Sequence, residues 1–276
     1  MSVTAEDFTF IADFLRRQSA ISIAEGKEYL VESRLAPVAR AAGMADVSEL
    51  IGQLRKPSAD PRVREQVVEA MTTNETSFFR DRHPFDALQT DIIPKLIEHK
   101  ANGTKTINIW SAASSTGQEI YSIAMLLDAH FPELATWNVQ LYGTDLSNDV
   151  LAKARSGRYS TLEVNRGLPA PMLARYFSRE GADYVLDERI RHRCRFDRMN
   201  LAEAWPLLPT FDIVFCRNVL IYFDLEVRRS ILDRIRQRLP EGGYLFLGTS
   251  ETTVGLAEGY TATRCGNAVA YCVEGS

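Results

Sequence analysis

The chain has 276 residues, 45% of them hydrophobic and 25% charged, which is typical of globular proteins that bury one large or two smaller cores. Its net charge of −4, from 32 basic and 36 acidic residues, argues against a general nucleic-acid-binding protein, which would be basic. No apolar run approaches the length of a membrane-spanning helix, so we expect no direct insertion into a membrane.

The N-terminal stretch MSVTAEDFTFIADF lacks the basic and apolar segments of a secretory signal, so we expect a cytoplasmic protein. The four cysteines are scattered, and the four histidines show no metal-ligand spacing. This pattern favours reduced thiols over a disulfide framework, and it predicts no metal site. In a cytoplasmic protein, the triplet Asn74-Glu75-Thr76 is not a glycan acceptor.

Residues 1–73 are predicted to form an all-α domain. The apolar residues of EDFTFIADFL recur at helical spacing, and EGKEYLVESRL and VSELIGQLRK predict two further helices. A fourth helix is predicted to begin at Asp60-Pro61, with Asp60 as its N-cap and Pro61 in its first turn. Lys27, Arg34 and Arg40 could form a basic face here, or simply a solvated one.

Residues 74–100 are predicted to be a linker followed by a helix through PFDALQTDIIPKLIEHK. Within residues 101–276, strands then alternate with helices. The segments TINIWSAA, NVQLYGTD, FDIVFCRN and GGYLFLGTS are apolar runs typical of parallel strands that are covered on both faces. The final YTATRC-GN-AVAYCV predicts a hairpin. The fold class is therefore α/β, an open Rossmann-like sheet with an antiparallel finish.

Residues from about 160 to 198 interrupt this alternation with short pieces such as ADYVLDE and RIRHRCRF. They are interpreted as a small inserted β subdomain. In it Arg191, Arg193 and Arg195 would lie at period two on one face of a strand. Such a row could bind an acidic protein segment or RNA, or it could keep an exposed strand edge soluble.

Ligands of open parallel sheets bind at the carboxyl ends of the strands. The first strand is followed by SAASSTG, whose small residues let a ligand approach the backbone and the start of a helix. This run is not a diphosphate-binding glycine loop. Glu119, in the first turn of that helix, could pair with a cationic ligand group or could complement the helix dipole.

Two further strand ends carry polar residues. Asp145 ends NVQLYGTD, where it could bind ribose hydroxyls or cap the next helix. Ser147 is also predicted as the cap of that helix, which runs through SNDVLAKARSG. Arg217 and Asn218 follow the strand FDIVF, either as ligand-binding residues or as ordinary loop residues, and Tyr222 comes soon after. A ribose site, a carboxylate for a cationic group and no diphosphate loop together favour S-adenosylmethionine, which is positively charged and has no phosphate.

Four longer stretches carry a resemblance to a known family. TNETSFFRD, WSAASSTGQEIYSIAMLL, GTDLSNDVLAKARSGRYS and FCRNVLIYFD, in this order, resemble the CheR family of chemotaxis-receptor methyltransferases. The resemblance covers nearly the whole chain. It implies a helical N-terminal domain, a linker, and a methyltransferase domain with an inserted β subdomain.

The same resemblance implies an activity. CheR enzymes use S-adenosylmethionine to esterify the γ-carboxylates of specific glutamates in chemotaxis receptors, which tunes sensory adaptation and leaves S-adenosylhomocysteine. The implied partner is the cytoplasmic helical region of those receptors, which a basic helix of the N-terminal domain faces in the family. In some members the β subdomain tethers a short peptide at the receptor C-terminus. We expect a monomer.

The family pattern also implies site residues. Arg80 and Tyr222 would be catalytic, flanking the transferred methyl group and the incoming glutamate. Gln118 and Ile120 stand where some relatives have a second acid and a proline, while Glu119 is retained. The residues that the pattern places at the cofactor are Asn74, Thr76, Arg80, Glu119, Asp145, Asn200, Leu201, Arg217 and Asn218.

Three rival functions fit the sequence less well. A nucleic-acid methyltransferase is supported only by the arginine row, and the chain has no N-P-P-Y or D-P-P-Y motif. A non-catalytic receptor-binding module would be favoured by loss of Arg80, Asp145 or Tyr222, and all three are present. A nicotinamide dehydrogenase would need the missing diphosphate loop.

Overall fold

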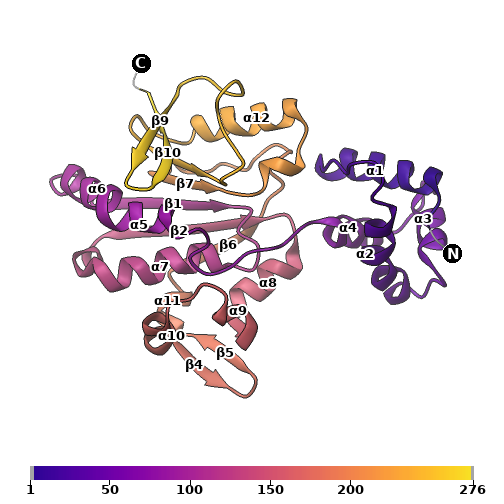
Figure 1. The fold of residues 1–276 in the computed structure, drawn as a ribbon, viewed down its shortest axis with the longest axis horizontal. Helices are drawn as coiled ribbons and strands as arrows, with labels where there is room; N and C mark the ends of the chain where they lie inside the picture. Colours follow the sequence, from indigo (N-terminus) through magenta and orange to yellow (C-terminus); the bar gives the residue numbers. More distant parts are fainter. Residues whose placement is uncertain (1–2, 275–276) are drawn as a thin grey trace. The chain divides into compact units, whose positions relative to one another are not determined.

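The computed structural model describes residues 3–274, which fall into two compact units (Figure 1). The first unit contains the chain up to Thr73 together with Tyr222–Arg228. The second contains Asn74–Ile221 and the chain from Arg229 onward. No helix within residues 3–274 is both long enough and apolar enough to span a membrane.

The first unit is built from helices, and their starts follow from local side-chain caps. Asp60 accepts a hydrogen bond from the N–H of Arg62 and Pro61 occupies the first turn, which confirms the predicted start of the fourth helix. Thr4 and Asp46 cap two other helices in the same way. The helices are α1 (Ala5–Ser19), α2 (Glu28–Ala41), α3 (Val47–Leu54) and α4 (Pro61–Met71).

Arg34 of α2 is bound within this unit. Its Nη1 donates to the carbonyl oxygens of Met71 at 2.7 Å and of Thr72 at 3.0 Å, and its Nη2 donates to Thr73 Oγ1 at 3.1 Å. A cation at the C-terminal end of α4 satisfies carbonyls that have no partner inside the helix. Arg34 therefore holds the segment that leads into residue 74, rather than lying on a simply solvated face.

The second unit is organised around a large mixed sheet, which confirms the predicted α/β class. In the part of the chain that the structure describes, this sheet has seven strands in the order β6-β2-β1-β7-β8-β10-β9. The pairs from β6 to β8 are parallel, and β10 pairs antiparallel with both β8 and β9. The strands are β1 (Thr106–Ala112), β2 (Asn138–Asp145), β6 (Cys194–Arg198), β7 (Ile213–Cys216), β8 (Tyr244–Leu247), β9 (Tyr260–Cys265) and β10 (Ala268–Val273).

Helices connect and cover these strands. The predicted helix after the linker is continuous but changes type, because a π-helical turn at Leu88–Ile92 separates α5 from α6. Ser147 caps the helix after β2 by accepting from the N–H of Val150, as the sequence indicated. The remaining helices are α5 (His83–Ala87), α6 (Ile93–Lys100), α7 (Gln118–His130), α8 (Asn148–Ser156) and α12 (Leu225–Arg236), with a 3-10 turn at Pro132–Thr136. Residues 225–228, the start of α12, belong to the first unit.

The part of the chain that follows α8 and precedes β6 forms a second sheet, separate from the large one (Figure 1). It has three antiparallel strands in the order β3-β5-β4. It is the small β subdomain that the sequence predicted within this segment. Its strands are β3 (Arg158–Ser160), β4 (Phe177–Glu180) and β5 (Asp183–Leu186), accompanied by α9 (Thr161–Asn165), α10 (Ala170–Tyr176) and α11 (Glu188–Arg191).

The prediction that Arg191, Arg193 and Arg195 lie on one face of a strand is wrong. Arg191 ends the short helix α11, because Asp187 caps that helix by accepting from the N–H of Arg189. A strand begins only at Cys194, and it is β6, the edge strand that pairs with β2 in the large sheet. Arg193 and Arg195 are separated by that boundary, so the three arginines do not share one strand face.

Linker residues Phe78 and Phe79 are fully or almost fully buried, at 0% and 8% exposure. The ring of Phe78 meets those of Tyr159 and Phe177 edge-on, with centroids 5.1 Å and 5.6 Å away. Gly167 approaches the backbone at the same place, since a Cβ on it would lie 2.2 Å from the carbonyl oxygen of Phe78. The small subdomain is thus packed onto the linker.

This contact predicts the effect of Gly167→Ala. Gly167 has φ +92° and Gly181 has φ +64°, so alanine at either position carries the cost of a left-handed backbone, about 1–2 kcal/mol. Only Gly167→Ala also meets the Phe78 carbonyl; nothing lies within 4 Å of a Cβ at Gly181. We expect urea unfolding to show that Gly167→Ala is less stable than Gly181→Ala by about 2 kcal/mol. Equal stabilities would contradict the packing.

Candidate active site

The carboxyl ends of four neighbouring strands meet at one edge of the large sheet. Ala112 at the end of β1 pairs with Thr144 of β2 and with Cys216 of β7, and Cys216 pairs with Leu247 of β8. The loops that follow these strands therefore start side by side. This is the edge at which open parallel sheets bind ligands.

The loop after β1 has an unusual backbone. Ala113 and Ser115 have positive φ angles of 56° and 51°, and Gly117, which precedes α7, has φ 91°. Left-handed conformations are uncommon for residues with a side chain, and they cluster at binding sites. The turn is held by hydrogen bonds from the N–H of Ser114 to Thr144 O and from the N–H of Ser115 to a carboxylate oxygen of Asp145.

Asp145 joins the loops after β1 and β2. Its Oδ2 accepts from the N–H of Ser115 at 2.8 Å, and its Oδ1 accepts from the N–H of Ser147 at 3.0 Å. Burial raises the pKa of this carboxyl above its ordinary value, against these hydrogen bonds, which lower it. The helix cap is Ser147, so the alternative role of Asp145 as that cap is wrong.

Glu119 and Arg217 form a buried ion pair, with Glu119 Oε2 and Arg217 Nη1 2.9 Å apart. The other Glu119 oxygen accepts from Ser111 Oγ at 2.8 Å. Arg217 Nη2 donates to Asp81 Oδ2 at 2.5 Å and to the carbonyl oxygen of Arg80 at 3.2 Å. Only 2% of the Arg217 side chain is exposed, so these two carboxylates, rather than water, compensate its buried charge.

The linker is bound to the same edge. Ser115 Oγ donates to the carbonyl oxygen of Asn74 at 2.8 Å, and Arg80 Nη1 donates to the carbonyl oxygen of Glu75 at 3.0 Å. The Glu75 side chain is ion-paired with Arg166, and the hydrogen bond from Arg166 lowers the pKa of that carboxyl. Thr76 lies half-buried within this held segment.

Asn200 and Leu201 follow β6 and lie near Asp145. The N–H of Met199 donates to the carbonyl oxygen of Asp145 at 2.8 Å, which ties the segment to the end of β2. Asn200 Oδ1 accepts from the N–H of Ala202 at 3.0 Å. The carbonyl oxygen of Leu201 accepts from Trp205 Nε1 at 3.1 Å, so Leu201 is fixed through its backbone.

The second unit thus brings the residues that the sequence placed at the cofactor to one sheet edge. Asn218 follows Arg217 with a left-handed φ of 59°. Tyr222, the last residue of the 3-10 turn Leu220–Tyr222, belongs to the unit of the N-terminal helices, where its carbonyl oxygen accepts a hydrogen bond from the N–H of Ser22 at 2.9 Å. Asp81 and Glu251 contact predicted site residues but were missed. The sequence gives a weak indication that Asp81 belongs to the site, because it directly follows Arg80.

Two protein-family models match this chain, and together they cover both of its units. The family model described as the CheR methyltransferase SAM-binding domain matches residues 74–268, and that of the CheR methyltransferase all-alpha domain matches residues 6–72. The chain belongs to the CheR methyltransferase family. It is therefore an S-adenosylmethionine-dependent methyltransferase, and the resemblance seen in the sequence is confirmed.

Curated relatives of this CheR-family enzyme match along nearly its whole length. Chemotaxis protein methyltransferase 1 of Pseudomonas aeruginosa is 42% identical over 276 residues, covering 98% of this chain and 99% of the relative. Chemotaxis protein methyltransferase Cher2 of Pseudomonas putida is 41% identical over 278 residues, with the same coverage. Among solved structures, the S-adenosylmethionine complex of the glycopeptide N-methyltransferase MtfA is 19% identical, covers 64% of this chain and 58% of that one, and has a TM-score of 0.33, too low to bear on function.

The residues at the sheet edge fit S-adenosylmethionine. Ser114 Oγ and Arg217 Nε are buried without a hydrogen-bond partner among the described residues. A buried donor left unpaired costs about 1–3 kcal/mol, so a ligand that offers acceptor oxygens here would relieve that cost. Within residues 3–274, no group of three or more His, Cys, Asp or Glu side chains is arranged to hold a metal ion.

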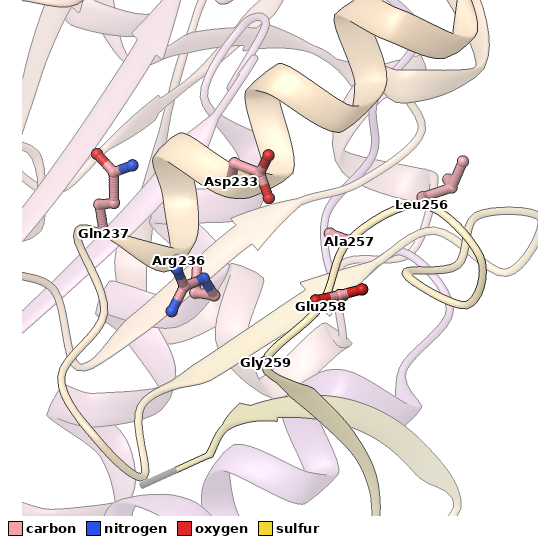
Figure 2. Close-up of a pocket in the computed structure, with 7 residues that line it drawn as sticks. All are labelled: Asp233, Arg236, Gln237, Leu256, Ala257, Glu258 and Gly259. Carbon is pink, nitrogen blue, oxygen red and sulfur yellow. The ribbon is translucent and has the colours of Figure 1, made fainter. Parts of the chain in front are cut away.

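A separate surface pocket of about 570 Å³ lies between α12 and the segment before β9 (Figure 2). None of the residues predicted for the cofactor lines it. Its lining is Asp233, Arg236, Gln237, Leu256, Ala257, Glu258 and Gly259.

The buried ion pair predicts a large effect of Arg217→Met. The change leaves Glu119, 13% exposed, and Asp81, 38% exposed, without their shared cation, which should lower the free energy of unfolding by about 3 kcal/mol, the low end for a broken buried pair because solvent screens Asp81. Arg158→Met is the matched control, because Arg158 is 43% exposed and pairs with Glu180 on the surface, where an ion pair is worth under about 1 kcal/mol. Urea unfolding measures both. Similar losses in the two variants would contradict the role of the buried pair.

Proposed function

We propose that this chain transfers the methyl group of S-adenosylmethionine to the γ-carboxylate of specific glutamates in the cytoplasmic helical region of chemotaxis receptors. The products would be glutamate methyl esters and S-adenosylhomocysteine, and the modification would tune sensory adaptation. The observation that carries the proposal is the match, over nearly the full length and both domains, to relatives named chemotaxis protein methyltransferases. We further propose that the chain acts in the cytoplasm as a monomer, without a metal and without nucleic acid.

The proposed methyl transfer requires little acid–base catalysis from the protein. When bound, S-adenosylmethionine supplies a methyl group on a positively charged sulfur. The γ-carboxylate of a glutamate has a pKa of about 4.3 and is already ionised near pH 7, so no general base is required. The chain has to bring the two groups to near-attack distance, align them and exclude water.

The carboxylates of the site suit the cationic and hydroxyl groups of the cofactor. Each Glu119 oxygen accepts one hydrogen bond from the protein, and a carboxylate oxygen can accept more than one. We propose that Glu119 binds the amino group of the cofactor and that Asp145 binds its ribose hydroxyls. Asn200, Leu201, Arg217 and Asn218 complete the contacts from the neighbouring loops.

The linker supplies the other part of the proposed site. Asn74 and Thr76 would close over the cofactor, in a segment of the second unit that Ser115 and Arg166 hold in place. A guanidinium carries five N–H donors, and one of those of Arg80 is bound to the Glu75 carbonyl. Arg80 is proposed to orient the substrate carboxylate with its remaining donors, and Tyr222 is proposed as the second catalytic residue.

The proposed reaction has a chemical signature. Incubation with S-adenosylmethionine labelled in its methyl group, together with receptor-containing membranes, should label the receptors. Mild base should then release the label as volatile methanol, because a carboxyl methyl ester hydrolyses and an N-methyl group does not. Membranes without receptors serve as the control. Label that stays in nucleic acid, or receptors that take up no label, would contradict the proposed substrate.

The role of Arg80 makes a separate prediction. Arg80→Ala should lower kcat by about a hundredfold or more, the scale expected when reacting groups are misplaced. Its Kd for S-adenosylhomocysteine should change much less. Arg82→Ala is the control, because Arg82 is an exposed neighbour in the chain and should keep nearly full turnover. An Arg80→Ala enzyme with unchanged turnover would rule the assignment out.

A further inference from the structure

A carboxylate outside the predicted set, that of Glu251, binds the loop that follows β7. This loop carries Arg217 and Asn218. The side chain of Glu251 accepts hydrogen bonds from five backbone N–H groups: those of Asn218 at 2.7 Å, Val219 at 2.9 Å, Leu220 at 2.8 Å, Ile221 at 3.4 Å and Gly248 at 2.7 Å. The two carboxylate oxygens share them, with Oε2 facing Asn218 and Gly248 and Oε1 facing the rest.

The turn after β8 aims this side chain. The N–H of Glu251 donates to the carbonyl oxygen of Gly248 at 2.9 Å, which closes a four-residue turn. The Glu251 side chain then folds back onto the N–H of Gly248. A Cβ on Gly248 would lie 2.7 Å from Glu251 Oε2 and 2.9 Å from the backbone N of Asn218, the two atoms that form one of these hydrogen bonds, so a larger residue there would disturb it.

The backbone N–H groups of the loop after β7 need a hydrogen-bond acceptor from outside the sheet. The strand ends at Cys216, and the left-handed φ of Asn218 turns the following N–H groups away from the β-ladder. Buried backbone N–H groups without partners are costly, and several that converge form a concavity suited to an anion. The carboxylate of Glu251 supplies that anion from the protein itself.

We propose that Glu251 is a positioning residue for cofactor binding, acting through the loop rather than by touching the cofactor. By binding the N–H groups from Asn218 onward, it fixes the conformation in which Arg217 and Asn218 face the sheet edge. This inference rests on the proposed function, because it takes Arg217 and Asn218 as cofactor-binding residues. The role requires a carboxylate, since all five partner groups are donors.

Glu251→Gln tests that requirement at nearly constant size. An amide has one acceptor oxygen, and its NH₂ group would face backbone N–H groups as a second donor. We expect the Kd for S-adenosylhomocysteine, measured by titration calorimetry, to rise about tenfold or more, since a partly buried hydrogen-bond network would be left partly unsatisfied. Glu251→Gln that binds S-adenosylhomocysteine within twofold of the wild type would overturn the proposal.

Glu163→Gln is the matched control. Glu163 also binds backbone with its carboxylate, accepting from the N–H of Ser160 at 2.9 Å in the capping box of α9. Its loss should lower stability as well, but the Kd for S-adenosylhomocysteine should stay within about twofold, because no predicted cofactor residue lies in that capping box. An equal loss of affinity in both variants would show a general effect on folding and would also overturn the proposal.

Hydrogen exchange provides a second test. It is measured on the unmutated chain, so it does not require that a substituted chain folds. The amides of residues 218–220 should exchange as slowly as those of β7, even without cofactor. Exchange as fast as in an exposed loop would contradict the anchoring role. A wild-type chain that binds S-adenosylhomocysteine but esterifies no receptor would contradict the proposed substrate and leave the role of Glu251 standing; a chain that does not bind it would overturn both.

Discussion

The candidate site depends on one constraint, the burial of the positive charge of Arg217. With 2% of its side chain exposed, this guanidinium is stable inside the protein only beside negative partners, because an unpaired buried charge costs several kcal/mol. Its two carboxylates come from different segments, Asp81 from the linker and Glu119 from the start of α7. Forming the pair therefore brings the linker, the loop after β1 and the loop after β7 to the same place.

A second feature repeats around this edge of the sheet. Asp145 and Glu251 each use a carboxylate to bind backbone N–H groups of loops that follow a strand, as Glu119 uses one to bind a side chain. Loops that must present side chains to a ligand cannot take their hydrogen bonds from the sheet, so they need partners of their own. These carboxylates let irregular loops stay fixed, which is what preorganised binding requires.

Local patterns made much of the fold predictable. Asp60-Pro61, Ser147 and the Gly266-Asn267 turn act within a few residues, and the apolar strands need only burial on both faces. The prediction that Arg191, Arg193 and Arg195 share one strand face was wrong because their period-two spacing does not reveal that Asp187 caps a short helix ending at Arg191. The partners of Arg217 and Asn218 could not be predicted, because Asp81 lies 136 residues from Arg217 in the chain and Glu251 lies 33 residues from Asn218. Strand-end position located the candidate residues, but only the fold shows what holds them.

The most direct test of this account is a crystal structure of the full chain with bound S-adenosylhomocysteine. We expect a single molecule at the carboxyl ends of β1, β2 and β7, with its amino group near Glu119, its ribose near Asp145, and contacts from the linker at Asn74 or Arg80. The ion pairs of Arg217 should be retained. Binding elsewhere, for example in the pocket beside α12 (Figure 2), or binding that leaves Glu119 and Asp145 without contact, would contradict the assignment of the site.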